Sequence, residues 1–144
     1  MIVLDTTMLV YAVGDEHPLR EPSRRIIEAI RDGRVAATTS VAVIQEFAHV
    51  RARRRGRADA GARAAQFAEL LAPLLPVAAD DVAPGLRLFE RHEELGAFDA
   101  FLAAAAIAHG ARALVSADEA FAAVDGLRYV NAAAPELGAL LRGA

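Results

Sequence analysis

The chain has 144 residues and a mass of 15.2 kDa, which favours a single domain, residues 1–144, built around one hydrophobic core. Its 16 basic residues are all arginine, and its 19 acidic residues give a formal net charge of -3. Without lysine, phosphate loops with an essential lysine and Schiff-base enzymes are excluded. Without cysteine, disulfides, thiolate nucleophiles, zinc knuckles and iron-sulfur clusters are excluded, and a cytoplasmic location is expected.

The sequence predicts no association with a membrane. Asp5 follows the opening apolar residues at once, so no signal-peptide pattern is present. The longest apolar run, residues 101–108, is far shorter than a membrane span and is typical of a buried helix.

Short apolar strands and amphipathic helices alternate along the chain. The first half is expected to contain a strand at 2–4, a helix at 22–31, a strand at 35–38, a helix capped by Ser40 that runs into an arginine cluster, and a helix at 59–71 capped by Asp59. A strand at 75–78 and helices at 81–94 and 99–109 are expected next. The chain is then expected to form a strand at 113–115, a short helix at 119–124, a strand at 127–130 and a helix from Pro135. This alternation indicates an α/β fold with three layers, α/β/α, and a mainly parallel central sheet.

Four acidic residues occupy positions where such folds place their ligands. Asp5 and Asp118 directly follow predicted strands, Asp99 opens the most apolar helix, and Glu46 borders the apolar face of its helix. Each also has a structural explanation: Asp5 as a turn or cap, Asp118 within a capping box led by Ser116, Asp99 as a complement to the helix dipole, and Glu46 as a solvated side chain. Convergence on one cleft is the more economical account of all four.

A shared pocket of carboxylates would need a cation. Two carboxylates about 5 Å apart repel by roughly 3 kcal/mol at an effective dielectric constant of 20. Oxygen ligands select hard cations such as Mg²⁺ or Mn²⁺, and none of the four histidines has zinc-site spacing. Carboxylate-held metal suits phosphodiester hydrolysis, because the ion activates a water and neutralises charge developing in the transition state.

An arginine cluster suggests the substrate. Five arginines occupy seven positions at the end of the helix that carries Glu46: Arg51, Arg53, Arg54, Arg55 and Arg57. Arginine binds phosphate oxygens bidentately, so these residues are candidates for RNA binding. The same cluster is also explained by a helix C-terminus that favours basic residues, or by an acidic protein partner.

With these residues assembled, the chain resembles the PIN-domain ribonucleases and, within them, the VapC-type toxins of toxin-antitoxin pairs. The resemblance rests on an ordered set of fragments that spans nearly the whole chain: Ile2-Val3-Leu4-Asp5-Thr6-Thr7, Val43-Ile44-Gln45-Glu46-Phe47, Phe98-Asp99-Ala100-Phe101-Leu102-Ala103-Ala104-Ala105, and Leu114-Val115-Ser116-Ala117-Asp118 with Phe121 beyond.

The resemblance implies a PIN-like fold and a set of functional residues. Asp5, Glu46, Asp99 and Asp118 would be the acidic quartet around Mg²⁺ or Mn²⁺, with catalytic and metal-binding roles. Thr6 and Ser116 would be hydroxyls that support the quartet. The resemblance further implies an endoribonuclease toxin that cleaves RNA with a metal-activated water, a homodimer, and a VapB-type antitoxin that occupies the active-site groove.

Two other functions remain open at this stage. In the first, the acids are caps and the chain is a non-catalytic α/β binding module that holds an acidic partner. In the second, the same pocket serves a metal-dependent phosphatase or DNA nuclease. For an RNA substrate, single strands or loops are favoured, because side chains cannot read the deep groove of an A-form helix.

Overall fold

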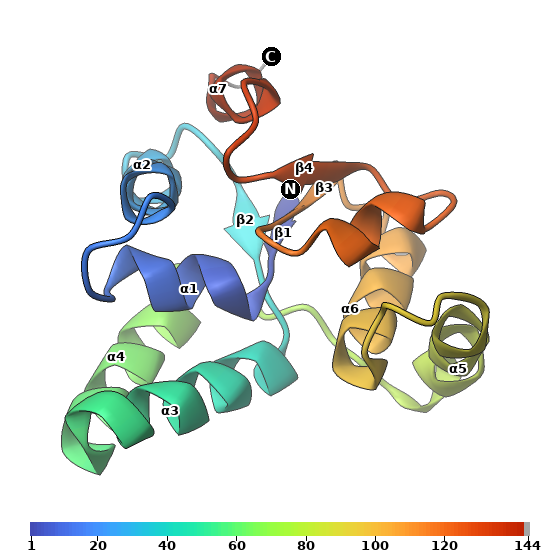
Figure 1. The fold of residues 1–144 in the computed structure, drawn as a ribbon, viewed down its shortest axis with the longest axis horizontal. Coiled ribbons are helices and arrows are strands. Elements are labelled where there is room, and N and C mark those ends of the chain that lie inside the picture. Colours follow the sequence, from blue (N-terminus) through green and yellow to red (C-terminus); the bar gives the residue numbers. More distant parts are fainter. Residues whose placement is uncertain (143–144) are drawn as a thin grey trace.

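The computed structural model describes residues 1–142 and contains a parallel four-stranded sheet with helices on both sides (Figure 1). The strands are β1 (Ile2–Leu4), β2 (Ala37–Thr38), β3 (Ala113–Ser116) and β4 (Tyr129–Asn131), in the order β2-β1-β3-β4. The predicted three-layer α/β class with a parallel sheet is confirmed. None of the helices within residues 1–142 is long and apolar enough to cross a membrane.

Within residues 1–142, seven α-helices and two short 3₁₀ turns accompany the sheet. They are α1 (Thr6–Ala12), α2 (Arg20–Arg31), α3 (Val41–Arg55), α4 (Arg57–Leu70), α5 (Val82–Arg91), α6 (Ala97–Ala108) and α7 (Glu136–Leu141), with short 3₁₀ turns η1 (Ala79–Asp81) and η2 (Glu119–Ala123). α1 and α2 lie on one side of the sheet and α5 and α6 on the other (Figure 1). α3 and α4 form a pair that lies beside α1, joined by the edge-on rings of Phe47 and Phe67.

The two central strands fix the relative position of the residues that follow them. β1 and β3 are fully buried and run parallel, with Leu4 paired to Val115. Because parallel strands end at the same edge of a sheet, Asp5 after β1 comes to lie beside Ser116 at the end of β3. The backbone N–H of Asp5 donates to the carbonyl of Val115 at 3.1 Å, which holds this register to the last residue.

Two predicted features of the middle of the chain are wrong. Residues 75–78 do not form a strand: Leu75 makes one isolated bridge to Ser40, and Pro76 has no N–H with which to continue a ladder. Asp59 does not cap α4, which begins at Arg57 after Gly56 and has Asp59 in its first turn. The cap predicted for α3 is confirmed, since the Ser40 hydroxyl accepts from the N–H of Val43 at 3.2 Å.

One helix was absent from the sequence-based expectation, and several boundaries move by a few residues. α1 has only seven residues, too few for an apolar period to be visible, although Asp5 provides its cap. α2 begins at Arg20 instead of 22, and β4 begins at Tyr129 instead of 127. The short helix at 119–124 is present as η2.

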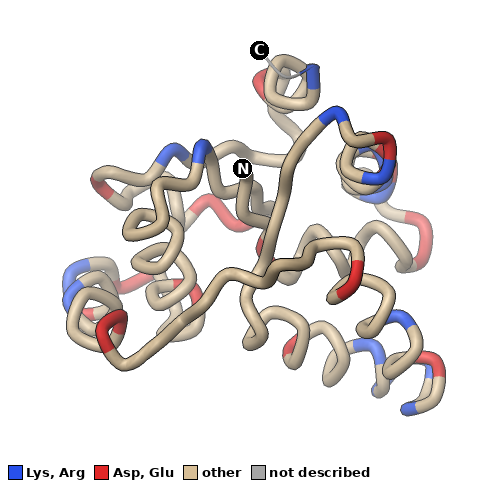
Figure 2. The backbone as a smooth tube through the Cα atoms, turned by 180° about the vertical axis from the view of Figure 1, so that it is seen from behind, with Lys and Arg blue, Asp and Glu red and all other residues tan. Residues whose placement is uncertain are grey.

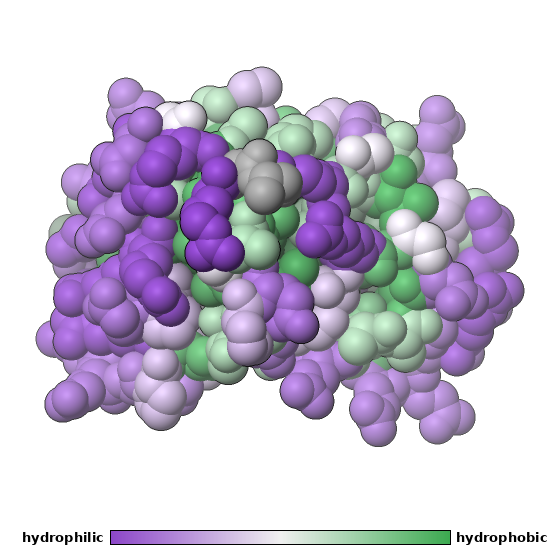
Figure 3. All heavy atoms as spheres, turned by 90° about the horizontal axis from the view of Figure 1, so that it is seen from above, coloured by the Kyte–Doolittle hydropathy of each residue, from purple (hydrophilic) through white to green (hydrophobic). Residues whose placement is uncertain are grey.

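The charged residues are mixed along the fold. Basic and acidic segments alternate over the whole trace, and neither sign gathers in one half of it (Figure 2). On the face that carries α7, hydrophilic side chains cover both ends and hydrophobic residues reach the surface between them (Figure 3). The net charge therefore says little about any one site, and the local arrangement has to be considered.

Candidate active site

Asp5 is a buried carboxylate held by three donors. It caps α1, where its Oδ1 accepts from the N–H of Thr6 at 2.6 Å. Its Oδ2 accepts from the Ser116 hydroxyl at 2.6 Å and from the Thr7 hydroxyl at 3.1 Å. Burial nevertheless raises the pKa of Asp5 above its usual range, and the nearby charge of Glu46 adds to this. Hydrogen bonds therefore fix the orientation of Asp5, while its burial and the charge of Glu46 disfavour its charged form.

Ser116 and Thr7 connect Asp5 to the chain that follows β3. The Ser116 hydroxyl, fully buried, donates to Asp5 and accepts from the N–H of Asp118 at 2.9 Å. The Thr7 hydroxyl likewise accepts from the N–H of Ala117 at 3.2 Å. The predicted capping box led by Ser116 is wrong: Ser116 ends β3, and Asp118 itself caps η2 by accepting from the N–H of Ala120 at 2.9 Å.

Glu46 comes from α3 and is oriented by α1. The Thr6 hydroxyl donates to Glu46 Oε2 at 2.8 Å, across 40 positions of sequence. Glu46, Val50 and Arg54 are spaced by four residues, so they lie along one face of α3. That face runs from the acidic residues toward the end of the helix, with Arg54 about 12 Å further along than Glu46.

Asp99 is the acid whose pKa is raised by all three of the other acids. It lies in the first turn of α6, whose N-cap is Gly96, and it is half-buried. Desolvation, followed by the charges of Asp5, Asp118 and Glu46, raises the pKa of Asp99 to about 7. The cap of α6 is Gly96 and not Asp99, and the N-terminus of a helix favours the charged form, so burial and the nearby acids raise this pKa against the effect of the helix. Among residues 1–142, none donates a hydrogen bond to its carboxylate.

One hollow brings the four acids together. It has a volume of about 310 Å³, and its wall contains two acids from the strand ends, Asp5 and Asp118, and two from helices, Glu46 and Asp99. The rest of the wall comes from α1 and α3: Thr6, Thr7, Val10, Tyr11, Val50 and Arg54. No histidine lines it, and the Glu46 and Asp118 carboxylates are solvent-exposed.

The donor set fits a hard divalent cation. Every acidic group in the hollow offers carboxylate oxygens, and a cation would relieve the repulsion that, after desolvation, raises the pKa of Asp99. Within the described part of the chain, no three acidic or histidine side chains converge closely enough to enclose an ion without movement. Glu46 and Asp118 are exposed and accept hydrogen bonds from Thr6 and Ala120, whereas Asp99 accepts none among residues 1–142. The hollow therefore gathers carboxylate oxygens, the ligands that a hard cation prefers, without enclosing an ion.

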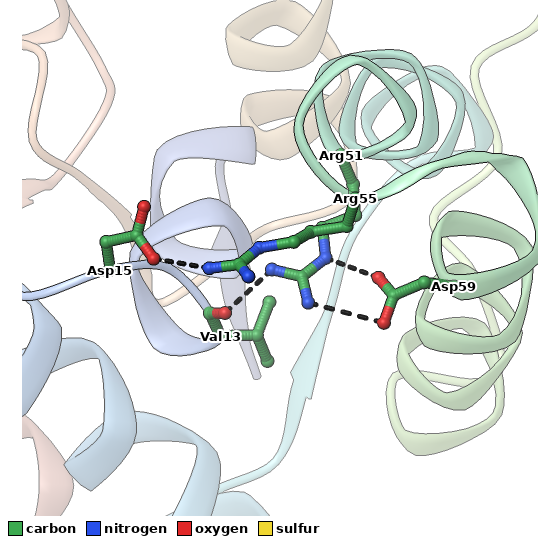
Figure 4. Close-up of polar contacts among 5 residues, drawn as sticks. All are labelled: Val13, Asp15, Arg51, Arg55 and Asp59. Carbon is green, nitrogen blue, oxygen red and sulfur yellow. Dashed lines mark hydrogen bonds and ion pairs between the residues drawn. The ribbon is translucent and has the colours of Figure 1, made fainter.

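The arginine cluster divides into residues with different contacts (Figure 4). Arg51 is used inside the protein: its guanidinium donates to the Val13 carbonyl at 2.8 Å and to Asp59 at 2.6 Å. Arg55 pairs with Asp15 in the loop after α1. Arg54 alone of the five lines the acidic hollow. The five arginines are thus not one equivalent binding surface, and Arg51 has no free guanidinium to offer a ligand.

Sequence reasoning missed Thr7 and Tyr11. Thr7 holds both Asp5 and the chain after β3, and Tyr11 lies on the same face of α1 one turn later. The signal for Thr7 was the pair of hydroxyl residues directly after the Asp5 cap. Finding Tyr11 required knowledge that residues 6–12 are helical.

Comparison with known proteins identifies the fold family. Residues 2–127 match the sequence model of the PIN domain. The chain belongs to the PIN-domain family. Within this PIN domain, the fragments carrying Asp5, Glu46, Asp99 and Asp118 all fall inside the matched residues.

Several relatives of this PIN domain carry the VapC name. It is 51% identical over 138 residues to Ribonuclease VapC7 of Mycobacterium tuberculosis, covering 90% of each chain. It is 38% identical over 101 residues to Ribonuclease VapC23 of the same species, covering 69% of this chain and 78% of the relative. A solved structure described as VapBC2 from Rickettsia felis bound to a DNA fragment from their promoter has a TM-score of 0.71 at 22% identity, covering 91% of this chain and 98% of that one. At that identity the structural match shows the fold alone.

Proposed function

We propose that this PIN-domain protein is a metal-dependent endoribonuclease that acts as the VapC-type toxin of a toxin-antitoxin pair. The carrying observation is the hollow in which four acids from separate elements meet, with the pKa of Asp99 raised to about 7 by burial and by the other three. Identity of 51% to a protein named Ribonuclease VapC7 supports the activity.

Asp5, Asp99, Glu46 and Asp118 would hold the metal, for which Mg²⁺ and Mn²⁺ are the candidates. When bound, such an ion lowers the pKa of a water and neutralises charge on the phosphodiester oxygens. The protein itself orients the carboxylates that would hold the ion. Asp5 is fixed by three donors, and the Thr6 hydroxyl holds Glu46 toward the same hollow. Thr6 and Ser116 thus act by holding carboxylates in place.

Metal removal tests this proposal. The purified protein is incubated with single-stranded RNA and with DNA of the same sequence, with Mg²⁺, with Mn²⁺, or with EDTA. We expect internal cleavage of RNA with metal and none with EDTA, because the carboxylates alone cannot activate water. Mn²⁺ should also raise the melting temperature, since a ligand that binds the folded state stabilises it. Cleavage that continues in EDTA, or DNA cleaved as fast as RNA, would contradict the proposal.

We further propose that Arg54 holds the RNA backbone. Arg54 faces the hollow from the far end of the α3 face that carries Glu46, so a strand bound across the acids passes over it. Arg54→Gln is expected to raise KM for a single-stranded RNA about tenfold with little change in kcat, since it removes one charge-assisted contact worth about 1.5–3 kcal/mol at most.

Arg53→Gln is the matched control for Arg54. Arg53 is an exposed neighbour on the same helix and does not line the hollow, so its loss should change KM by less than about twofold. The two variants have the same net charge. Equal effects of both would show that the arginines act only through the general electrostatic field.

The VapC relatives and the surface support proposals about the partners. We place a VapB-type antitoxin at the active-site groove and place the protein in the cytoplasm with its RNA. We also propose a homodimer, supported by exposed apolar residues Val41, Val77 and Phe98, of which the last two line a hollow of about 250 Å³. Analytical ultracentrifugation of the wild type and Phe98→Glu checks the dimer.

A further inference from the structure

An aromatic pair lies next to the acidic hollow. The rings of Tyr11 and His17 are stacked, with centroids 4.3 Å apart and planes inclined by 17°. Tyr11 lines the hollow from the last turn of α1 and is the only aromatic residue among those described that does so. His17 follows in the loop between α1 and α2 and is solvent-exposed. The exposed ring of His17 therefore lies flat against Tyr11, which lines the hollow.

The His17 ring is held in place although it is exposed. Its Nδ1 accepts from the backbone N–H of Leu19 at 3.1 Å, which fixes the plane of the ring from its edge. Tyr11 covers one face. The other face has no stacked partner among residues 1–142, where the remaining aromatic pairs are Phe47 with Phe67 and Phe121 with Tyr129.

The loop that carries His17 is anchored to α3. Arg51 donates to the Val13 carbonyl at 2.8 Å, and Arg55 pairs with Asp15, so two arginines hold the loop from one side (Figure 4). These contacts explain why two members of the arginine cluster are committed within the protein. They also mean that a ligand stacking on His17 would meet a ring that is already ordered, which lowers the entropy cost of binding.

We propose that Tyr11 and His17 form a base-stacking platform, on which a nucleobase near the cleaved phosphodiester stacks against the exposed face of His17. This rests on the proposed ribonuclease function and adds a base contact to it. The carboxylates and Arg54 recognise metal and phosphate, and neither distinguishes a nucleobase from an abasic sugar. Single-stranded RNA is bound elsewhere by stacking of unpaired bases on aromatic side chains, which every base permits. The platform therefore favours unpaired RNA without choosing a sequence.

The test measures binding without cleavage. Fluorescence anisotropy in an Asp99→Asn background reports the binding of a fluorescein-labelled uridine decamer and of the same decamer with abasic riboses. His17→Asn keeps an acceptor for the Leu19 N–H but removes the ring. We expect it to weaken binding of the uridine decamer about tenfold and to leave binding of the abasic decamer unchanged. His17→Phe, which restores a ring, should recover most of the lost affinity.

Two controls separate stacking from structural effects: the abasic decamer and a second histidine variant. His109→Asn makes the same substitution at the exposed end of α6 and should alter neither affinity. A purely structural role of His17 would weaken both decamers equally. That outcome, or a parent protein that does not prefer the intact decamer, overturns the platform. Absence of RNA cleavage by the wild type, with the His17→Asn effect intact, would instead overturn the ribonuclease proposal and leave the platform standing.

Discussion

Asp99→Asn is expected to reduce the rate of RNA cleavage by at least about a hundredfold, because it removes the charge of an acid proposed to hold the metal. Asparagine has nearly the shape of aspartate but no charge, so the variant removes the negative charge of Asp99 without a change in packing. Asp99 is half-buried and receives no hydrogen bond from residues 1–142, so the substitution breaks no side-chain hydrogen bond of the fold. Mapping of cleavage products from total RNA, wild type against variant, measures the loss.

The same variant should be more stable than the wild type when metal is absent. Burial and the three nearby acids raise the pKa of Asp99 from its ordinary value of 3.8 to about 7, so the folded protein holds this proton more tightly than the unfolded chain. The stability of the metal-free wild type should therefore fall as pH rises from about 4 to about 7. Solvent screening at this half-exposed group reduces the expected loss to about 1–2 kcal/mol. Thermal melts of Asp99→Asn should lack this part of the pH dependence.

Asp80→Asn provides the comparison for both measurements. Asp80 is exposed in η1 and does not line the hollow, so it should keep the cleavage rate and the pH dependence of the wild type. If Asp99→Asn cleaved RNA at the wild-type rate, Asp99 would not be a metal ligand. If it were instead destabilised, the repulsion among the acids would be smaller than the pKa of Asp99 implies.

The sequence predicted the strand ends well because their position depends on a general property of parallel sheets. Asp5 and Asp118 were selected because each directly follows an apolar strand, and the pairing of Leu4 with Val115 brings those ends together. The helix that carries Asp99 was found from its continuous apolar character. These features depend on local pattern and on a shared direction of strands, both of which a single sequence contains.

The sequence alone does not predict contacts between segments that are far apart in the chain. The five arginines look equivalent in the sequence, yet the fold directs Arg51 into the protein, Arg55 to a loop and Arg54 to the hollow. Arg57 is not at the end of the helix that carries Glu46, as predicted, but begins α4 after Gly56. The directions of Arg51, Arg54 and Arg55 depend on the helical rotation of 100° per residue relative to α1, whose existence was not predicted. The stacking of Tyr11 on His17 depends on the same short helix and on the turn after it.

Ser116→Ala is expected to lower cleavage about 10- to 100-fold, although Ser116 would not touch the metal. The Ser116 hydroxyl donates to Asp5 Oδ2 at 2.6 Å, and this bond lowers the pKa of Asp5 against the effect of burial. Its loss should raise the pKa of Asp5 further and leave Oδ2 held only by the longer bond from the Thr7 hydroxyl. The half-saturating metal concentration should then rise, and the rate should reach its plateau at a higher pH.

Stability gives the second readout for Ser116. The same hydroxyl accepts from the N–H of Asp118, and alanine leaves that donor without a partner and Asp5 Oδ2 with only the Thr7 hydroxyl, at a cost of about 1–3 kcal/mol. Ser23→Ala is the matched control, because Ser23 is fully buried in α2 and has only a weak 4.0 Å contact with the Met8 sulfur. A Ser116→Ala protein that melts earlier but keeps the wild-type metal requirement would show that Ser116 supports the fold alone. A raised metal requirement at a temperature where the variant is fully folded would show that orientation of Asp5 by Ser116 is part of the site.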